Sequence, residues 1–425
     1  QDKVHRLQGQ LGLTEKEVAT ILGRLKAKAT FSYVKKKIPE EDAAKVMALK
    51  LTGVGLEAAT RRHYPHGSLA AHILGGISRA ENTRAGVESR YNNVLKGVEG
   101  QQITYKVNGG REFETHIVKS PVAGKDLYLT LDATIQYFVE KELERAVAEH
   151  EASWGAVVVM EPETGDILAM ASLPTYDVNQ YPGPEDAWMN RAIGASYEPG
   201  STFKIITAAA ARERNRVGFS EVFDCSAGHI TVGGLTIRDH ERVGILSFPQ
   251  VLIESSNVGT VLFAQRLSIP EYCETIKAFG IGTKTGIDLP AEASGKIRPA
   301  EDWNKKNSLP HIAIGYEVMV TSLQMLQAMN VFATGGRLVR PHVVKDAGAP
   351  QASGGPGRVI SEKTAADLVG RVFEKVVEEG TAKLGRLDGY RIAGKTGTAQ
   401  KWDPAVGAYT RAYTASFVGF TPVEK

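Results

Sequence analysis

The sequence predicts an α+β protein with two domains, a smaller one over residues 1–125 and a larger one over residues 126–425. Length supports two domains, because 425 residues exceed one typical domain of about 150 residues. The sequence pattern changes near Asp126: glycine-rich segments with short, interrupted apolar runs give way to segments with regularly spaced apolar residues. In the larger part, strand patterns at both ends enclose a mainly helical middle, which favours an α+β fold.

The first 60 residues have the pattern of helices. Leu11–Thr14 opens a stretch of helical periodicity, and a second helix is expected to begin at Pro39–Asp42. The apolar positions of the first stretch are Val18, Ile21, Leu22 and Leu25. From Arg61 to about Gly124 we expect short strands, such as Thr104–Val107, between glycine-rich breaks.

The larger domain begins with a predicted strand at Leu127–Leu131. A helix at Ile135–Val147 follows, with Asp132 as its N-cap. Two apolar strands, Trp154–Met160 and Asp166–Met170, flank a Pro-Glu-Thr-Gly turn, which is the pattern of a β-hairpin.

The rest of this domain is first helical and then returns to strands. Helical patterns run from Phe203 to about Ala333, and a further helix is predicted near Glu362–Glu379. Strands are predicted at Tyr390–Ala393 and Ala412–Phe420. We expect the early hairpin to pair against these late strands.

Composition excludes several classes of protein. Apolar residues make up 42% of the chain, with 44 Gly and 18 Pro, which is typical of globular domains rather than disordered or collagen-like chains. A net charge of +3 argues against nucleic acid as a partner. The charge is uneven, because residues 1–125 carry 21 Lys and Arg against 12 Asp and Glu, and the rest carries 30 against 36. The basic front part suits an anionic membrane surface, although a solvated basic face is the commoner reason for such a balance.

The chain shows no membrane span and no disulfide framework. No run of about 18 apolar residues occurs, and no signal peptide pattern is visible. The chain begins at Gln1 rather than Met, so we expect that an N-terminal segment, with any anchor, has been removed. Cys225 and Cys273 form no CxxC pair and are expected to be buried thiols.

Ser201 is the first candidate for catalysis. It follows Glu198-Pro-Gly and precedes an apolar helix, so it sits at a helix N-terminus, where free N–H groups stabilise a developing anion. Lys204 lies one turn further on the same face, and a Ser–Lys pair can act as nucleophile and base. A second Ser-x-x-Lys, Ser32 with Lys35, lies in a Lys-rich stretch without a helix start and is interpreted as a solvated face.

Two further motifs are candidates for the same site. Ser255 and Asn257 form a Ser-x-Asn pattern, which taken alone is more simply a polar turn between helices. Lys395-Thr-Gly-Thr398 follows the strand predicted at Tyr390–Ala393 and places a cation and two hydroxyls on an extended edge.

The last of these motifs also satisfies the P-loop pattern of nucleotide hydrolases, GxxxxGK[ST], from Gly389 to Thr396. A P-loop needs a strand before the loop and a helix after it, so that helix N–H groups hold phosphates. Here the predicted strand occupies the would-be loop, and residues 397–404 are a poor helix. A nucleotide hydrolase is therefore a remote alternative.

No metal or cofactor site is predicted. His63 and His66 lie in a loop with Pro65, and His150-Glu151 lacks the second His of HExxH. The GxSxG nucleophile elbow of the α/β-hydrolases is also missing.

In chain order, Ser201-x-x-Lys204, Ser255-x-Asn257 and Lys395-Thr-Gly-Thr398 resemble the active-site triplet of the penicillin-recognising serine enzymes. The chain also resembles, nearly end to end, the class B penicillin-binding proteins, the monofunctional peptidoglycan transpeptidases. This resemblance implies the transpeptidase fold, an antiparallel sheet with a helical subdomain, after a pedestal or dimerisation-type domain.

Local segments carry the resemblance as well. Residues 62–67, 71–75 and 86–97 look like the family's pedestal module. Val320–Gln324 looks like a family signature, with Ser322 where Pro is usual. Thr396 after the lysine looks more like the cell-division or sporulation branch than the elongation branch.

The resemblance implies a role for each motif in acyl transfer. Ser201 would attack the carbonyl of a stem peptide ending in D-Ala-D-Ala, and Lys204 would take its proton. Ser255 would relay a proton to the departing D-Ala, and Asn257 would hold the donor peptide and the lysine. An amine of a neighbouring stem would then take the acyl group.

The third motif would bind the substrate's charge. Lys395, with Thr396, Gly397 and Thr398, is implied to hold the terminal carboxylate. The backbone N–H groups of Ser201 and Thr398 would form the oxyanion hole. A second cation near Lys204 would also lower the Lys204 pKa, as a base at neutral pH requires.

Related activities share these motifs. A β-lactamase would hydrolyse its acyl-enzyme through an extra base, and Glu301-x-x-Asn304, which superficially resembles one such pattern, is interpreted as surface. A D,D-carboxypeptidase differs only in using water as acceptor. A β-lactam sensor would keep Ser201 without turnover.

The resemblance further implies peptidoglycan stem peptides as substrates, β-lactams as inhibitors, and a membrane-embedded glycan polymerase with other divisome proteins as partners. It places the protein at the cell membrane, through a single-pass anchor absent from this chain, with the catalytic domain on the extracytoplasmic face. The family continues beyond Lys425 with a strand and a helix, so we expect a trimmed C-terminus. The front part is too short for a glycosyltransferase, so no glycan polymerisation is expected.

Overall fold

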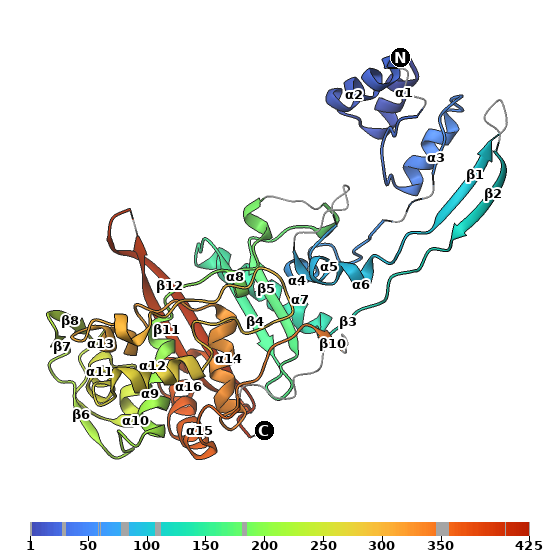
Figure 1. Cartoon of the computed structure of the whole chain (residues 1–425). Coiled ribbons are helices and arrows are strands. Elements are labelled where there is room, and N and C mark those ends of the chain that lie inside the picture. The colour runs from blue at the N-terminus through green and yellow to red at the C-terminus, as the bar shows by residue number, and fades with distance from the viewer. Residues whose placement is uncertain are drawn as a thin grey trace. The chain divides into compact units, whose positions relative to one another are not determined.

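The chain forms two compact units (Figure 1). The first comprises Gln1–Gly67 and Ile77–Thr83, and the second comprises Ser68–Gly76 and Arg84–Lys425. The computed structural model describes residues 2–27, 31–57, 59, 61–77, 85–106, 112–180, 185–345, 357–403 and 405–424.

The first unit contains the helices α1 (Asp2–Leu11), α2 (Glu15–Lys26) and α3 (Glu40–Ala48). A capping box starts α2, because the Thr14 hydroxyl accepts the Glu17 N–H while the Glu17 carboxylate accepts the Thr14 N–H. The buried core side chains of this unit are Val4, Leu7, Leu11, Leu13, Val18, Ile21 and Val46. The helices predicted after Thr14 and Pro39 are confirmed.

The second unit begins with short helices and a hairpin. These elements are α4 (Ala71–Leu74), α5 (Gly86–Arg90), α6 (Asn92–Leu95), β1 (Gln101–Lys106) and β2 (Glu112–Lys119). β1 pairs antiparallel with β2. The strand predicted at Thr104–Val107 lies in β1 as far as Lys106, and Val107 is outside the described residues.

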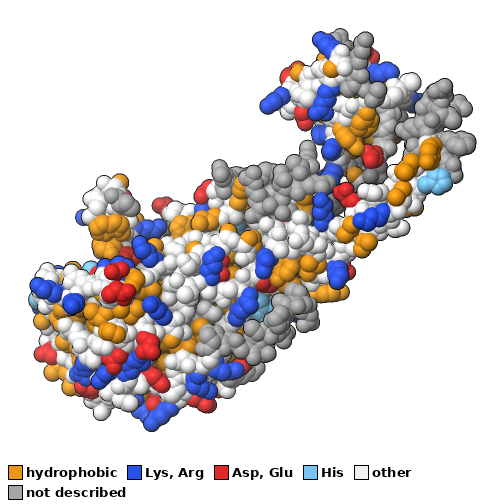
Figure 2. All heavy atoms as spheres, in the orientation of Figure 1, with side chains coloured by type: hydrophobic (Ala, Val, Ile, Leu, Met, Phe, Trp, Pro, Cys, Tyr) orange, Lys and Arg blue, Asp and Glu red, His pale blue; other side chains and the backbone are white. Residues whose placement is uncertain are grey.

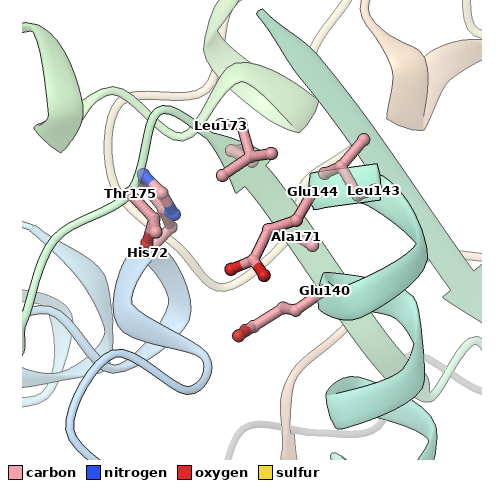
Figure 3. Close-up of a pocket in the computed structure, with 8 residues that line it drawn as sticks. His72, Glu140, Leu143, Glu144, Ala171, Leu173 and Thr175 are labelled. Carbon is pink, nitrogen blue, oxygen red and sulfur yellow. The ribbon is translucent and has the colours of Figure 1, made fainter. Parts of the chain in front are cut away.

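The segment that carries α4 is attached to α7 (Ala133–Glu149) and to the chain after β5 (Ile167–Leu173). The Ala70 N–H donates to Glu140 Oε1 over 2.8 Å. His72 lies edge-on to Tyr176, and burial lowers the pKa of its imidazole to about 4. Figure 3 shows the small pocket that remains between these parts, with the labelled side chains His72, Glu140, Leu143, Glu144, Ala171, Leu173 and Thr175.

α7 packs on the hairpin of β4 (Gly155–Met160) and β5. The predicted N-cap is confirmed, because the Asp132 carboxylate accepts the N–H groups of Thr134 and Ile135. The antiparallel pairing of β4 with β5 is also confirmed. The strand predicted at Leu127–Leu131 is shorter, since β3 (Tyr128–Leu129) pairs only with the two-residue β10 (Val344–Lys345).

The middle of the chain is mainly helical, as predicted. Its helices are α8 (Arg191–Gly194), α9 (Lys204–Glu213), α10 (Phe248–Ile253), α11 (Asn257–Ala264), α12 (Ile269–Ala278), α13 (Ser308–Ala313) and α14 (Ser322–Ala333). Short strands that the periodicity did not predict lie among them: β6 (Val222–Asp224), β7 (His229–Val232), β8 (Leu235–Arg238) and β9 (Ile245–Ser247). The largest core cluster lies here and includes most of α9, while Cys225 and Cys273 are buried free thiols, as predicted.

The last part of the chain contains two helices and two long strands. They are α15 (Glu362–Leu368), a π-helical turn (Val369–Phe373), α16 (Glu374–Glu378), β11 (Ala393–Asp403) and β12 (Ala408–Phe420). The helix predicted near Glu362–Glu379 is therefore confirmed. Further 3-10 turns lie at Val178–Gln180, Glu185–Trp188, Gly200–Phe203, Ala300–Asp302 and Lys383–Gly385.

Two expectations about the late strands are wrong. The strand predicted at Tyr390–Ala393 begins only at Ala393, because pairing with β12 starts there, with Ala393 opposite Phe420. The early hairpin does not pair against the late strands. Among the described residues, β4 with β5 and β11 with β12 form separate two-stranded sheets.

The surface carries basic and acidic side chains interspersed (Figure 2). Hydrophobic side chains lie on the projecting β11–β12 hairpin, where Trp402, Val406 and Tyr413 are exposed. Within the residues that the structure describes, no helix is both long and apolar enough to cross a bilayer.

Candidate active site

Ser201 lies in a 3-10 turn, Gly200–Phe203, that runs directly into α9. The turn starts with Gly200 at φ 54°, a left-handed conformation that glycine adopts without strain. Ser201 is half-buried, and Lys204, three residues later, is the first residue of α9. The predicted position of Ser201 at a helix start is confirmed.

Ser255 lies in the turn between α10 and α11, and Asn257 is the first residue of α11, so the interpretation as a polar turn holds for Ser255. Ser255 has φ 58°, a left-handed conformation that is uncommon for a residue with a side chain. The hydroxyl of Ser256, between them, caps α11 by accepting the Gly259 N–H. This turn points both motif side chains at the start of α9.

Lys204 connects the first two motifs. Its side chain is wholly buried, and Nζ donates to the Ser255 carbonyl over 2.6 Å and to Asn257 Oδ1 over 2.8 Å. The Ser255 hydroxyl lies 3.3 Å from the same nitrogen.

Lys395 brings the third motif to the same hydroxyl. It is wholly buried on β11, and its Nζ donates to Ser255 Oγ over 2.9 Å and to the Thr396 carbonyl over 3.1 Å. The Ser255 hydroxyl therefore lies between two lysine amines, which suits it to relay a proton.

Burial depresses the pKa of both lysines. For Lys204 burial is the largest cause, the charge of Lys395 lowers the pKa further, and Asp239 opposes both, with the result well below the ordinary 10.5. Burial lowers the pKa of Lys395 to about 7. The predicted effect of the second cation is confirmed, but burial is the larger cause and the sequence did not show it.

β11 passes directly over the turn that holds Ser201. A Cβ on Gly397 would lie 2.8 Å from the Pro199 carbonyl oxygen and 2.9 Å from Thr202 Cγ2, so glycine is needed at this crossing. The close approach places Thr398, which is exposed, beside the turn that carries Ser201. The Thr396 hydroxyl lies 2.6 Å from that of Thr381.

Asp239, in the loop after β8, is a functional candidate that the sequence analysis missed. Its carboxylate accepts the Ser256 hydroxyl over 2.9 Å and the N–H groups of Asn257 and Val258. It thereby fixes the Ser-x-Asn turn at the start of α11, where a negative charge is also favoured by the helix dipole. It stands in the charged run Arg238–Arg242, which gives no recognisable signal.

The alternatives that the sequence left open find no support in the geometry. Ser32 donates to a neighbouring carbonyl and Lys35 to the carbonyl of Leu11, away from any helix start. The P-loop pattern is wrong as an interpretation, because its Gly-Lys-Thr lies inside β11 and a strand follows it instead of a helix. Glu301 and Asn304 are exposed, as predicted. No cluster of three metal-ligating side chains occurs among the residues with described positions.

This fold and site define the class of penicillin-recognising serine enzymes. The family of the penicillin binding protein transpeptidase domain matches residues 155–425, and that of the penicillin-binding protein dimerisation domain matches residues 2–129. The chain belongs to the class B penicillin-binding proteins. Proteins of this family act in cell-wall synthesis outside the cytoplasm.

Curated relatives agree with the family. The chain is 34% identical over 432 residues to penicillin-binding protein PbpB of Mycolicibacterium smegmatis, with 96% of this chain and 65% of the relative covered. It is 34% identical over 437 residues to stage V sporulation protein D of Bacillus subtilis (97% and 67%) and 32% identical over 402 residues to peptidoglycan D,D-transpeptidase FtsI of Escherichia coli K12 (94% and 66%). The sporulation protein among these relatives fits the predicted cell-division or sporulation branch, and the chain spans about two thirds of the relatives' length.

Solved structures show the same fold. Penicillin binding protein 3 of Mycobacterium tuberculosis, complexed with aztreonam, superposes with a TM-score of 0.75 at 32% identity, covering 86% of this chain and 81% of that chain. A peptidoglycan synthetase of Bifidobacterium adolescentis gives a TM-score of 0.74 at 27% identity, covering 99% and 77%. The predicted α+β transpeptidase fold with a preceding dimerisation-type domain is confirmed.

Proposed function

We propose that this chain is a serine D-Ala-D-Ala transpeptidase that cross-links peptidoglycan stem peptides and is acylated by β-lactams at Ser201. The observation that carries the proposal is the meeting of three motifs at the Ser255 hydroxyl, which contacts the amines of both Lys204 and Lys395. The family match, the relatives named D,D-transpeptidases and the aztreonam complex of a structural neighbour support it.

In the acylation step, Ser201 Oγ forms a bond to the carbonyl carbon of the penultimate D-Ala, and the bond to the terminal D-Ala nitrogen breaks. The hydroxyl proton passes to Lys204, whose depressed pKa leaves its amine able to accept it. Ser255, within reach of Lys204, passes a proton to the leaving nitrogen, while Asn257 orients Lys204 and the donor peptide.

In this proposal, residues of β11 bind the negative groups of the substrate, which are its terminal carboxylate and the oxyanion. Lys395, Thr396, Gly397 and Thr398 bind the terminal carboxylate of the donor. The N–H groups of Ser201 and Thr398 stabilise the oxyanion, a contribution of about 3 kcal/mol per donor in enzymes of this kind. In the second step, an acceptor amine forms the new amide bond to the acyl carbon, the ester bond to Ser201 Oγ breaks, and the proton of the amine returns to Ser201 Oγ.

The cellular setting is proposed from the family. The chain is anchored in the cell membrane by a single-pass segment outside this sequence, and its partners are a membrane-embedded glycan polymerase and other divisome proteins. We also propose the division into a pedestal over residues 1–125 and a transpeptidase domain over residues 126–425, close to the two family matches.

The test is intact-protein mass spectrometry after incubation with benzylpenicillin. A stable adduct of one penicillin mass is expected for the wild type and for the control Ser32→Ala, and no adduct for Ser201→Ala. Absence of an adduct together with hydrolysed drug would instead indicate a β-lactamase. Absence of an adduct with intact drug would contradict the proposal.

A stem-peptide substrate separates the remaining activities. With a D-amino acid as acceptor, a transpeptidase yields the exchanged peptide, whereas a D,D-carboxypeptidase yields only the shortened one. Mass spectrometry of the peptide products distinguishes them.

A further inference from the structure

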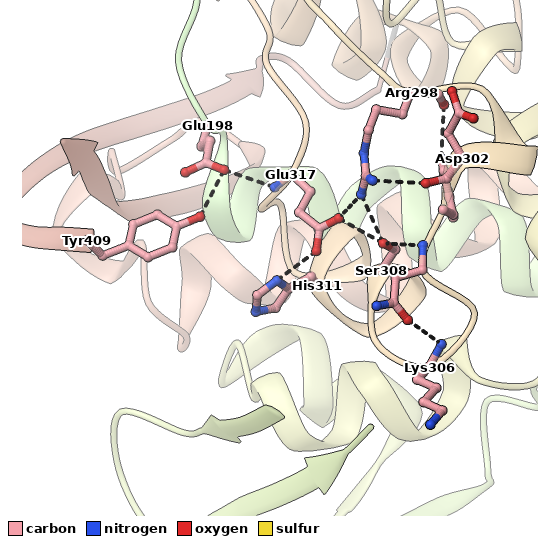
Figure 4. Close-up of polar contacts among 10 residues, drawn as sticks. Glu198, Arg298, Asp302, Lys306, Ser308, His311, Glu317 and Tyr409 are labelled. Atoms are coloured by element: carbon pink, nitrogen blue, oxygen red, sulfur yellow. Dashed lines mark hydrogen bonds and ion pairs between the residues drawn. The ribbon is translucent and has the colours of Figure 1, made fainter. Parts of the chain in front are cut away.

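Glu198, three residues before Ser201, holds two other parts of the chain. Its Oε1 accepts the backbone N–H of Glu317 over 2.9 Å and the hydroxyl of Tyr409 over 3.1 Å. Figure 4 shows Glu198 between these two residues, with Tyr409 extending from β12. The carboxylate thus joins the segment that carries the nucleophile to the loop after α13 and to β12.

Backbone hydrogen bonds hold the residues on either side of Glu198 against residues 315–320. Tyr197 exchanges two hydrogen bonds with Val320, each 2.9 Å, and the Gly200 N–H donates to the Gly315 carbonyl over 3.1 Å. A Cβ on Gly315 would lie 2.1 Å from the Gly200 carbonyl oxygen, so the two glycines allow this contact. The segment before Ser201 therefore lies along residues 315–320 as one rigid piece.

Tyr409 brings the β11–β12 hairpin to this piece. It lies opposite Trp402 of β11 and packs edge-on against Trp402 and Tyr316, with ring centroids 5.2 Å apart in both pairs. Tyr316 also hydrogen-bonds the backbone of Gln400, two residues beyond Thr398 on β11. The hairpin is thus attached to the nucleophile segment just past the motif that faces Ser201.

The carboxylate of Glu317, the second one near Glu198, has its own hydrogen-bonding partners. Glu317 accepts hydrogen bonds from Arg298 and from Ser308, and its other oxygen lies 3.0 Å from His311 Nδ1 (Figure 4). Glu317 has φ 57°, and these contacts hold its backbone N–H toward Glu198. The Glu198 carboxylate can therefore keep both of its hydrogen bonds without facing an unpaired charge.

We infer that Glu198 and Tyr409 are positioning residues that hold strand β11 at the distance from Ser201 that acyl transfer requires. The inference rests on the proposed function. Neither side chain is assigned a contact with substrate, and both act through β11 and the 3-10 turn. Misplacement of reacting groups by about 1 Å costs on the order of 100-fold in rate, so a loosened hairpin slows acylation while the motif side chains stay in place.

The experiment measures acylation of the full chain by a fluorescent penicillin in stopped flow. It separates the rate constant of the covalent step from the dissociation constant of the preceding complex. Tyr409→Phe, which removes one hydroxyl and keeps the ring, is expected to lower the covalent rate constant roughly 3- to 10-fold. Glu198→Ala is expected to lower it about 100-fold, with the dissociation constant changed less than about 3-fold.

Two further variants make the test specific. Glu198→Gln retains a carbonyl oxygen that can accept both hydrogen bonds, and it should restore the rate to within about 3-fold of wild type. Tyr413→Phe changes an exposed tyrosine on the same strand and should leave the rate unchanged. A merely structural role would lower the fraction of protein that reacts, seen as burst amplitude, and not the rate constant of that fraction.

The outcomes separate this inference from the proposed function. If the wild type does not react with penicillin, the proposed function fails. If the wild type reacts and Glu198→Ala and Tyr409→Phe match its rate constant, the positioning role is wrong. If Glu198→Ala does not fold, as judged by its thermal transition, Tyr409→Phe against Tyr413→Phe decides the question.

Discussion

At the scale of single residues, the main feature of the site is a pair of buried lysines whose amines both contact the hydroxyl of one serine. Lys204 and Lys395 are both wholly buried, and both contact Ser255 Oγ. Each therefore destabilises the folded state when protonated, which is a common cost of catalytic groups. The same burial makes the amines available as a base and as a switchable cation near neutral pH.

Burial of Lys395 should make the free energy of unfolding depend on pH. Its folded pKa is about 7 and its ordinary value is 10.5, so between these values the unfolded chain binds more protons than the folded one. The free energy of unfolding contributed by Lys395 therefore rises with pH across this window, by on the order of 1 kcal/mol per pH unit. Below about pH 7 the destabilisation is complete.

The variant Lys395→Met isolates this contribution. The difference in free energy of unfolding, wild type minus variant, should increase from pH 7 to pH 10 in urea titrations. A difference that stays flat or decreases over this range would show that Lys395 is not held neutral by burial.

Asp239 gives a second prediction at this scale. Asp239→Ala removes three hydrogen bonds to the Ser-x-Asn turn and should lower the free energy of unfolding by about 2 kcal/mol. It should also slow acylation, because Asn257 and Ser255 lose their fixed position. Urea denaturation and penicillin acylation check both effects, with Glu241→Gln, an exposed neighbour, as the control.

The sequence could predict the three motifs but not what surrounds them. Ser201, Lys204, Ser255, Asn257 and Lys395 stand in recognisable local patterns, whose spacing is a property of the chain alone. Asp239 contacts Ser256, 17 residues away, and Glu198 contacts Glu317 and Tyr409, 119 and 211 residues away, so no local pattern shows these contacts. Burial of the lysines likewise depends on tertiary packing.

At the scale of elements, local patterns predicted helices and hairpins well and strand pairing poorly. Asp132 and Thr14 are caps that act within one helical turn, so their sequence neighbours suffice to place α7 and α2. The Tyr390–Ile392 stretch alternates like a strand, yet it pairs with no strand among the described residues, because β12 ends opposite Ala393. Strand pairing is non-local and register depends on which partner is present.

A substitution at Gly397 tests the packing of β11 on the turn of Ser201, because the absence of a side chain there allows the close approach. In Gly397→Ala the added methyl group would meet the Pro199 carbonyl at 2.8 Å, so the strand must move outward. We expect acylation by penicillin to fall at least about 100-fold. Gly385→Ala, where a Cβ meets open space, should react like the wild type. Equal rates for the two variants would refute the close crossing.

At the scale of the whole molecule, the two compact units each have their own hydrophobic core. The three motifs all lie in the second unit, whose core surrounds α9. The charge is also uneven along the chain, since residues 1–125, which hold the first unit and the start of the second, are basic and the remainder is acidic.

A shortened chain of residues 68–425 tests this separation. It lacks α1, α2 and α3 but keeps the contacts of Ala70 and His72 within the second unit. Its acylation rate constant should lie within about 2-fold of that of the full chain, measured with the same fluorescent penicillin. A large loss of rate with an intact thermal transition would mean that the first unit shapes the site.

Because the pKa of Lys395 is about 7, only part of the protein carries a proton on this amine near neutral pH. Binding of an anionic ligand is therefore expected to be coupled to the uptake of a proton by Lys395. In the proposed function, a stem peptide or a β-lactam would bring a carboxylate to this amine, and a negative partner raises the pKa of a cation beside it. At pH values above about 7 the amine must therefore gain a proton from the medium as the ligand arrives. The heat of binding then includes the heat of buffer deprotonation, so calorimetric enthalpies differ between buffers, and affinity for anionic ligands weakens as the solution becomes more alkaline.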